Sequence, residues 1–231
     1  MGKFWKFFIA VILLPTAFFA LWQLGRVVFD LVFVSKSVLF FIAGAVIYAA
    51  VHIKIYNFSR LYVLAHEGMH ALAALFFGYK VHSMKVKEDS GQVKMSDINA
   101  AVVLAPYVVP LYFLIGALVC FILYKTGYDN AWWVSSFAAV LGFLWGFHIL
   151  HTVKTLTETT QPDLKAAGGK TFSLVVIVVV NILFALIITA VIFPGHVSLF
   201  SALKDIFVST FKFWKAVIDY AVDFTVRTFK L

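Results

Sequence analysis

Long apolar runs separated by short polar segments dominate the chain. A run of about 20 apolar residues spans the hydrocarbon core of a bilayer as a helix. Six runs meet this length, and they occupy residues 7–24, 37–56, 61–78, 98–124, 131–151 and 171–193. The pattern therefore predicts an all-α polytopic membrane protein with about six transmembrane helices.

The first run could instead belong to a cleaved signal peptide, because Lys3 and Lys6 precede it. Its apolar part is longer than that of a usual signal peptide, and no Ala-x-Ala-like cleavage site precedes Arg26. We therefore expect residues 7–24 to be a retained membrane span.

Two segments depart from the apolar pattern. Apolar and polar residues alternate through residues 80–96, with turn residues at the centre, which favours a small membrane-associated β-hairpin over a solvated loop. From Val197 onward, apolar residues recur at helical spacing with charged residues opposite them. Residues 197–231 are therefore predicted to form an amphipathic helix at the membrane interface, following an embedded core of residues 1–196.

Prolines and glycines add detail to two of the spans. Pro106 and Pro110 predict a kink in the 98–124 span, and carbonyls freed by such a kink must find partners in lipid. In the next span, Gly142 and Gly146 favour close packing against another helix.

Composition agrees with this pattern and narrows the range of partners. Hydrophobic residues make up 63% of the chain and charged residues 13%, and the mean hydropathy is +0.97, all far outside the range of soluble domains. The net charge of +8 comes from cations spread over loops and the terminal segment, so we expect anionic lipid headgroups as partners rather than nucleic acid. Cys120 is the only cysteine, which argues against a disulfide framework and suits a buried apolar position.

The residues that carry chemistry are concentrated in an HExxH motif at residues 66–70, inside the 61–78 run. On an α-helix, residues i and i+4 share a face, so His66 and His70 can both bind one Zn²⁺. Glu67 then lies beside the ion, where it can take a proton from a water molecule whose pKa the cation lowers. Ionisable side chains in a membrane cost about 2.5–3.5 kcal/mol each, which favours a bound metal over a polar cluster satisfied by neighbouring helices. The motif therefore predicts a zinc-dependent hydrolase.

Residues 61–91 resemble the active-site region of the site-2 protease family of intramembrane metalloproteases. As in that family, small and apolar residues follow the HExxH motif, Gly78 ends the helix, and a strand comes next. The resemblance implies bound Zn²⁺, hydrolysis of peptide bonds within the membrane, and a strand edge that can pair with an extended substrate. The family often has Gly-Pro followed by Asn near the fourth span. This chain has Ala105-Pro106 without that Asn, so no role in oxyanion stabilisation is carried over.

A catalytic zinc takes three protein ligands and keeps one open position. The third ligand of the family is an Asp within Leu-Asp-Gly after a Pro-containing turn. The resemblance therefore implies Asp163, although Leu164 stands where the family has Gly. Three alternatives stay open: Glu158, His148 and His151. For Asp163 to reach the two histidines, the polar stretch 152–170 must fold back into the helix bundle.

These patterns together predict an intramembrane zinc metalloprotease that cleaves membrane-anchored protein substrates. Glu67 would be the general base, and His66, His70 and Asp163 would hold the metal. The alternatives are a membrane metal carrier or sensor, and a catalytically silent relative that acts as a binding partner, against which the intact Glu67 argues. Lys and Arg are nearly balanced between the two faces, and the resemblance and the basic terminal helix favour cytoplasmic termini. We expect a multi-pass protein of a prokaryotic plasma membrane.

Overall fold

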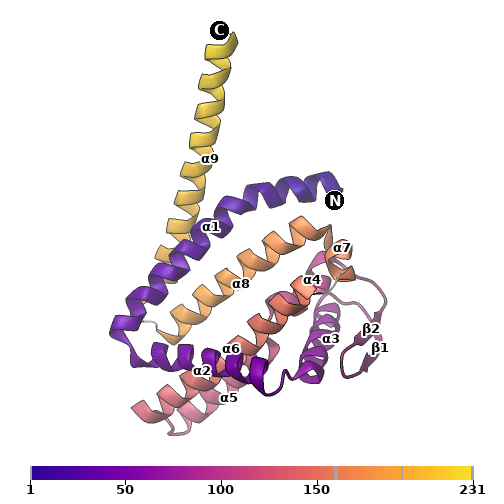
Figure 1. The fold of residues 1–231 in the computed structure, drawn as a ribbon, viewed down its shortest axis with the longest axis vertical. Coiled ribbons are helices and arrows are strands. Elements are labelled where there is room, and N and C mark those ends of the chain that lie inside the picture. The colour runs from indigo at the N-terminus through magenta and orange to yellow at the C-terminus, as the bar shows by residue number, and fades with distance from the viewer. Residues whose placement is uncertain (1, 159–160, 194, 230–231) are drawn as a thin grey trace. The chain divides into compact units, whose positions relative to one another are not determined.

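A computed structural model of the protein describes residues 2–158, 161–193 and 195–229. Within these residues the backbone is mostly helical, with one two-stranded antiparallel sheet (Figure 1). The chain divides into two compact units, and their residues are Leu31–Ser173 for one and Met1–Asp30 with Leu174–Leu231 for the other. The HExxH motif lies in the unit formed by Leu31–Ser173.

The unit Leu31–Ser173 contains eight complete elements among its described residues. They are α2 (Lys36–Lys54), α3 (Ser59–Phe76), β1 (Val81–Val86), β2 (Gly91–Met95), α4 (Ala100–Val108), α5 (Leu111–Lys125), α6 (Ala131–Glu158) and α7 (Pro162–Ala167). The strands β1 and β2 pair antiparallel and both contact α3 (Figure 1). The hairpin predicted at residues 80–96 is therefore confirmed.

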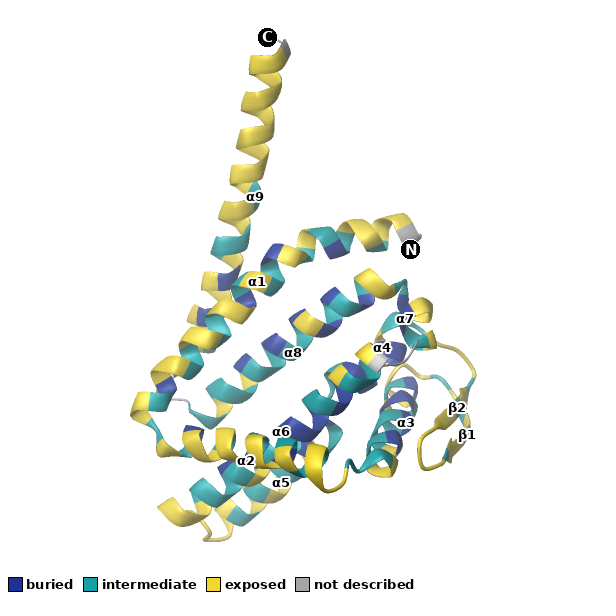
Figure 2. Ribbon diagram, viewed as in Figure 1, coloured by how far each residue is buried: buried dark blue, intermediate teal, exposed yellow. Residues whose placement is uncertain are grey.

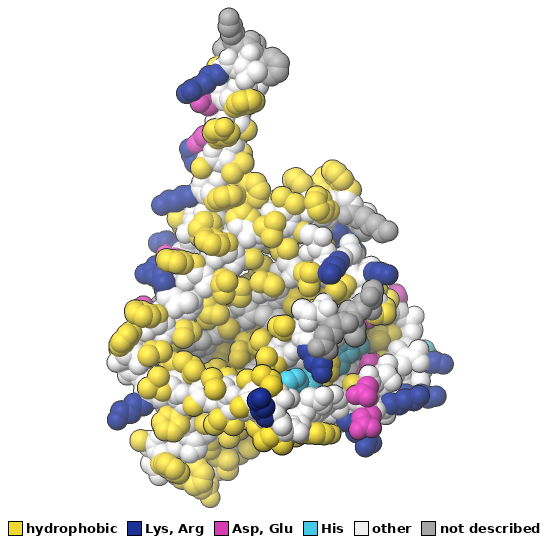
Figure 3. Space-filling view, viewed as in Figure 1, with side chains coloured by type: hydrophobic (Ala, Val, Ile, Leu, Met, Phe, Trp, Pro, Cys, Tyr) yellow, Lys and Arg dark blue, Asp and Glu magenta, His cyan; other side chains and the backbone are white. Residues whose placement is uncertain are grey.

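Four described helices are long and apolar enough to cross a membrane, and they are Phe4–Val34, Lys36–Lys54, Ala131–Thr157 and Lys170–Ile192. A fifth candidate is the pair α4 and α5, taken as one bent span. Apolar side chains cover much of the visible surface (Figure 3), as expected for helices that face lipid. The chain is therefore a membrane protein with four or five candidate spans in its described part.

The prediction of six spans is not confirmed, because α3 is not among these candidates. Although α3 has 18 residues, its Arg60, two histidines and glutamate lower its hydropathy. The first span is also longer than predicted. Its helix α1 (Lys3–Val34) continues through Arg26 and Asp30, since charged residues end an apolar run without ending a helix.

The helices α2 and α6 touch at backbone level. A Cβ added at Gly142 would overlap the carbonyl oxygen of Phe41, and one added at Gly146 would lie 3.1 Å from the carbonyl oxygen of Ala45. Glycines of this kind let two helices approach closely, so that dispersion contacts hold them together where no hydrophobic driving force acts. The packing role predicted for these two glycines is confirmed.

The bend between α4 and α5 measures 61° and falls at two prolines. Proline disfavours helical backbone in the residue before it, and Val109, which precedes Pro110, has φ −105° and ψ 109°. Pro106 lies inside α4 and has no N–H, so the carbonyl of Val102, four residues earlier, lacks its helical donor. The predicted kink is therefore confirmed at Pro110, while Pro106 frees the carbonyl of the fully buried Val102.

The second unit is formed by most of α1, most of α8 (Lys170–Ile192), and α9 (Leu199–Phe229). Its core contains small and branched residues, namely Ala20, Ile182, Leu186, Ala202 and Ile206. Most of the rest of α9 is exposed (Figure 2). Its charged side chains form i,i+4 ion pairs, Lys215–Asp219 at 2.8 Å and Arg227–Asp223 at 3.0 Å, as suits the solvated face of an amphipathic helix.

Candidate metal centre

The HExxH motif is placed by α3, which starts after a tight turn. The side chain of Asn57 accepts hydrogen bonds from the backbone N–H and the hydroxyl of Ser59. Helical spacing then puts His66 and His70 on one face, with ring centroids 4.9 Å apart and ring planes at 84°. Glu67 and His70 are 8% and 7% exposed. The two imidazoles are therefore neighbours in a largely buried site.

The imidazole of His70 is oriented by a backbone carbonyl of α4. Its Nδ1–H donates to the carbonyl oxygen of Val102 over 3.0 Å, and this is the carbonyl that Pro106 leaves without a helical donor. A proton held on Nδ1 leaves Nε2 with its lone pair free for a metal. A carbonyl freed by proline, which the sequence predicted would need a partner, is thus the acceptor that orients a candidate ligand.

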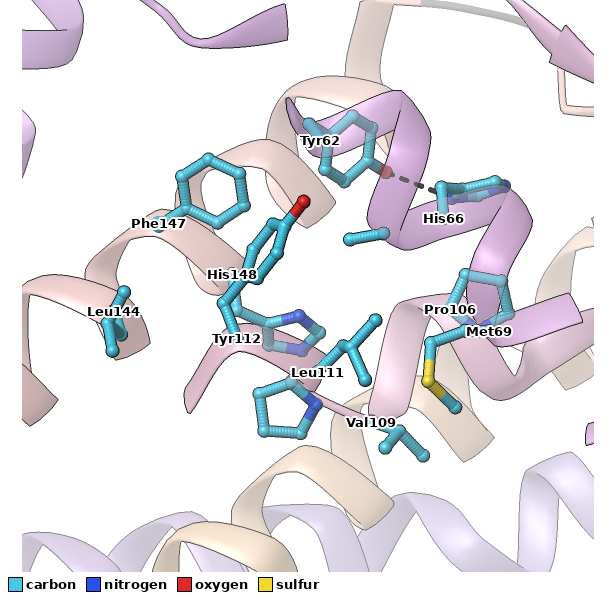
Figure 4. Close-up of a pocket in the computed structure, with 12 residues that line it drawn as sticks. Tyr62, His66, Met69, Pro106, Val109, Leu111, Tyr112, Leu144, Phe147 and His148 are labelled. Atoms are coloured by element: carbon cyan, nitrogen blue, oxygen red, sulfur yellow. Dashed lines mark hydrogen bonds between the residues drawn. The ribbon is translucent and has the colours of Figure 1, made fainter. Parts of the chain in front are cut away.

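His66 is oriented from its own helix. Its Nδ1 lies 3.3 Å from the hydroxyl of Tyr62, one turn earlier (Figure 4). The ring of His66 also meets the ring of Tyr107 edge to face, with centroids 5.0 Å apart. When Nδ1–H donates to Tyr62, the Nε2 lone pair of His66 points away from that bond and is free for a metal.

Asp163 completes the group from α7, where it follows Pro162 in the first turn. The segment does not stay in solvent, because Leu164 and Ala167 are buried and α7 packs on α4. Asp163 Oδ2 lies 3.5 Å from Nε2 of His66 and 3.3 Å from Nε2 of His70. The polar stretch therefore folds back toward the histidines, as the third-ligand hypothesis requires.

The carboxylate of Asp163 is held ionised by its neighbours. Burial acts to raise its pKa, but hydrogen bonds with His66, His70 and Tyr107 outweigh burial and hold the pKa well below its usual range. The hydroxyl of Tyr107, itself fully buried, donates to Oδ2 over 2.9 Å and lies 3.1 Å from the side-chain oxygen of Gln161. The third candidate ligand is thus a fixed anion.

The geometry of the three atoms fits a tetrahedral metal ion. Ligands at about 2.0–2.1 Å from a tetrahedral zinc are separated by about 3.3 Å, close to the 3.3 and 3.5 Å measured from Asp163 Oδ2. All three ligand atoms lie within 4.8 Å of one another. With both imidazole protons on Nδ1, the two Nε2 lone pairs and Oδ2 of Asp163 would face a common point, where a cation would take the place of the hydrogen bonds between them. The donor set of two imidazoles and one carboxylate suits Zn²⁺.

The other proposed ligands do not join this group. Within the described side chains, His66, His70 and Asp163 form the one cluster of three residues that could hold a metal ion. His151 stacks on Tyr62, with centroids 4.5 Å apart and planes at 9°, and His148 lines a cavity of about 20 Å³ behind His66 (Figure 4). The side chain of Glu158 lies outside the described residues. The two α6 histidines therefore pack around the site without belonging to the cluster.

Two clefts meet at the candidate centre. One has a volume of about 470 Å³ and is lined by the three candidate ligands and by strand β2. The other, of about 420 Å³, runs toward Ser59 and His151. His66, Glu67 and Gly91 line both clefts. Acidic and histidine side chains are visible together on this face of the molecule (Figure 3). The site is therefore open to water.

Sequence reasoning missed three residues that support the ligands. Tyr62 carried a usable signal, because it precedes His66 by four residues on the same helical face. Tyr107 and Gln161 carried none, because the contacts of Tyr107 with Gln161 and Asp163 join residues 54 and 56 positions apart. Such contacts follow from the packing of α4 on α7 and have no local pattern.

Replacing Tyr107 with Phe should weaken zinc binding about 10- to 100-fold, the usual cost of losing a partner of a metal ligand. The variant keeps the ring that packs on His66 and removes the hydroxyl that orients Asp163. Competition with a chromophoric chelator would measure the zinc dissociation constant. Tyr124→Phe removes an exposed hydroxyl and is the matched control. Equal constants for both variants would contradict this role.

The candidate centre brings together a helix-borne histidine pair, a carboxylate on α7, a buried glutamate and a strand beside the cleft. Compared with family models, curated proteins and solved structures, the chain has no match.

Proposed function

We propose that the protein is an intramembrane zinc metalloprotease of the site-2 type. The observation that carries the proposal is the convergence of His66, His70 and Asp163 beside a cleft that Glu67 also lines. A structural zinc site is closed by four protein ligands, whereas a catalytic one keeps a position open. No fourth metal-binding residue joins the three among the described side chains, which favours a catalytic site.

Each residue of the site would have a separate role in peptide hydrolysis. Zn²⁺, when bound, supplies a Lewis acid that lowers the pKa of a water molecule and polarises a carbonyl oxygen. Glu67 accepts a proton from the attacking water and passes it to the amine released when the C–N bond breaks. The water oxygen ends in the new carboxylate. Tyr62, Tyr107 and the Val102 carbonyl keep the ligands oriented throughout.

Strand β2 supports an extended peptide as the substrate. In the part of the chain that the structure describes, the sheet has two strands, so β2 pairs there with β1 on one side only. Gly91, Gln92, Val93 and Met95 of β2 line the cleft that holds the candidate ligands. A peptide that adds to this edge would present its carbonyls to the site, whereas a helical segment would have to unwind first. We infer that the substrate is a membrane-anchored protein with an extended cleavage segment.

The finer membrane arrangement belongs to the same proposal. Helix α3 would be a sixth span, with its histidines and glutamate turned toward the cleft and away from lipid. Helix α9 would lie at the interface with its cations near anionic headgroups, outside the embedded core of residues 1–196. Both termini would face the cytoplasm of a prokaryote.

The test uses the full chain purified in detergent micelles. We expect about one zinc ion per chain by elemental analysis, and cleavage of a model single-span substrate that a chelator abolishes and added zinc restores. A matched substrate with a stable, uninterrupted helix at the cleavage segment should be cut more slowly. Absence of stoichiometric metal, or cleavage that a chelator leaves unchanged, would contradict the proposal.

A further inference from the structure

Gly91, the first residue of β2, lies directly against the side chain of Glu67. A Cβ added at Gly91 would overlap Cγ of Glu67 and lie 2.7 Å from its carboxyl carbon and from Oε1. Real Cβ atoms essentially never approach other heavy atoms this closely. One partner would therefore have to move if residue 91 carried a side chain.

The requirement for glycine at this position comes from space rather than from backbone conformation. The φ of Gly91 lies outside the left-handed region, unlike that of Gly78 at the end of α3. Gly91 also pairs with Val86 in the regular register of the hairpin, where any residue fits the backbone. Contact with Glu67 is thus the feature that sets this position apart.

The neighbouring glycine of the motif offers a contrast. A Cβ added at Gly68 would meet only Leu111 of α5, at the ordinary contact distance of 3.9 Å. In a helix interior, Ala is also favoured over Gly by roughly 0.5–1 kcal/mol. The same added methyl group therefore fits at position 68 as the structure stands, whereas at position 91 it requires the Glu67 side chain to move.

We propose that Gly91 is a positioning residue for Glu67. The bare backbone at the start of β2 forms the wall on which the glutamate rests, and it fixes how far the carboxylate extends into the cleft shared with His66. This inference rests on the proposed function, because it assigns Glu67 the role of general base. The same strand, β2, would then both bind the substrate and position the general base.

The first experiment separates this role from docking and from folding. Gly91→Ala should keep its zinc and its KM, while kcat falls about 10²-fold, the cost of misplacing a reacting group by about 1 Å. Gly68→Ala should cleave at the wild-type rate. Unchanged kcat in Gly91→Ala would overturn the proposal, and so would a raised KM at unchanged kcat, since that pattern assigns the residue to docking.

The second experiment measures the contact without relying on activity. In a Cys120→Ser background, Glu67→Cys combined with Gly91→Cys should form a disulfide on mild oxidation, because Sγ at position 67 would replace the Cγ that a Cβ at position 91 overlaps. Gly68→Cys with Gly91→Cys is the control and should stay reduced, because Gly68 faces Leu111. Mass spectrometry under non-reducing conditions would show whether each double variant contains the disulfide.

The two experiments also separate this inference from the proposed function. If the wild-type protein binds no metal and cleaves nothing while the disulfide forms at 67 and 91, the protease proposal fails and Gly91 has no base to position. If the wild-type protein cleaves but the 67–91 pair stays reduced, the protease survives and the inference about Gly91 fails. Retained kcat in Gly91→Ala has the same meaning as a missing disulfide.

Discussion

Glu67→Gln is expected to keep its zinc and to lose about 10²- to 10⁴-fold in cleavage rate, the usual contribution of a general acid–base group. The amide has nearly the same size as the carboxylate, so the packing against Gly91 remains. It cannot accept a proton from water, and neither histidine nor Asp163 is changed. Elemental analysis for zinc and single-turnover cleavage of the model substrate give the two readings.

The control for this variant is Glu88→Gln in the hairpin turn. Glu88 is exposed, and its replacement removes the same charge outside the cleft. We expect the control to cleave at the wild-type rate. Wild-type cleavage in Glu67→Gln as well would rule out Glu67 as the base and would show that another group beside the candidate ligands accepts the proton.

Asp163→Asn should weaken zinc binding by at least an order of magnitude, because losing even a partner of a ligand has this cost. The substitution removes the anion whose Oδ2 faces both Nε2 atoms at 3.3 and 3.5 Å. The amide oxygen that remains is neutral, so it is a weaker ligand for a dication than the carboxylate. Chelator competition would measure the dissociation constant, with cleavage measured at saturating zinc.

Asp129→Asn is the matched control, because Asp129 is exposed in the turn before α6. The control should leave both the dissociation constant and the cleavage rate unchanged. An unchanged zinc affinity in Asp163→Asn would show that another group completes the site. It would leave the histidine pair in place and reopen the position that His148 and His151 do not fill.

Local patterns predicted the parts of the fold that depend on neighbours along the chain. The alternation in residues 80–96 gave the hairpin, and the paired prolines gave the kink, because each follows from backbone chemistry over a few residues. The prediction of six spans went beyond what this pattern supports. An apolar run around a polar motif can mark a helix that packs inside a bundle as well as one that crosses lipid.

Local patterns likewise predicted only part of the candidate site. His66, Glu67 and His70 could be predicted because helical spacing alone places them together. Asp163 entered only through the family resemblance, since it lies 93 residues beyond His70 and no local period relates them. The contact between Gly91 and Glu67 could not be predicted from the sequence for the same reason. It depends on how the hairpin folds against α3, and a glycine at a strand start is usually explained by the turn before it.

The proline in α4 ties two distant positions to each other. If residue 106 carried an N–H, the helix could reclaim the Val102 carbonyl, and the Nδ1–H of His70 would have to share that acceptor with the helical donor. Conversely, without His70 the carbonyl of the buried Val102 would lose the donor that replaces its missing helical one. The missing helical hydrogen bond at Pro106 and the hydrogen bond from His70 therefore compensate each other. A substitution that restored the helical bond would weaken the hydrogen bond that orients the His70 imidazole, and would do so without destabilising α4.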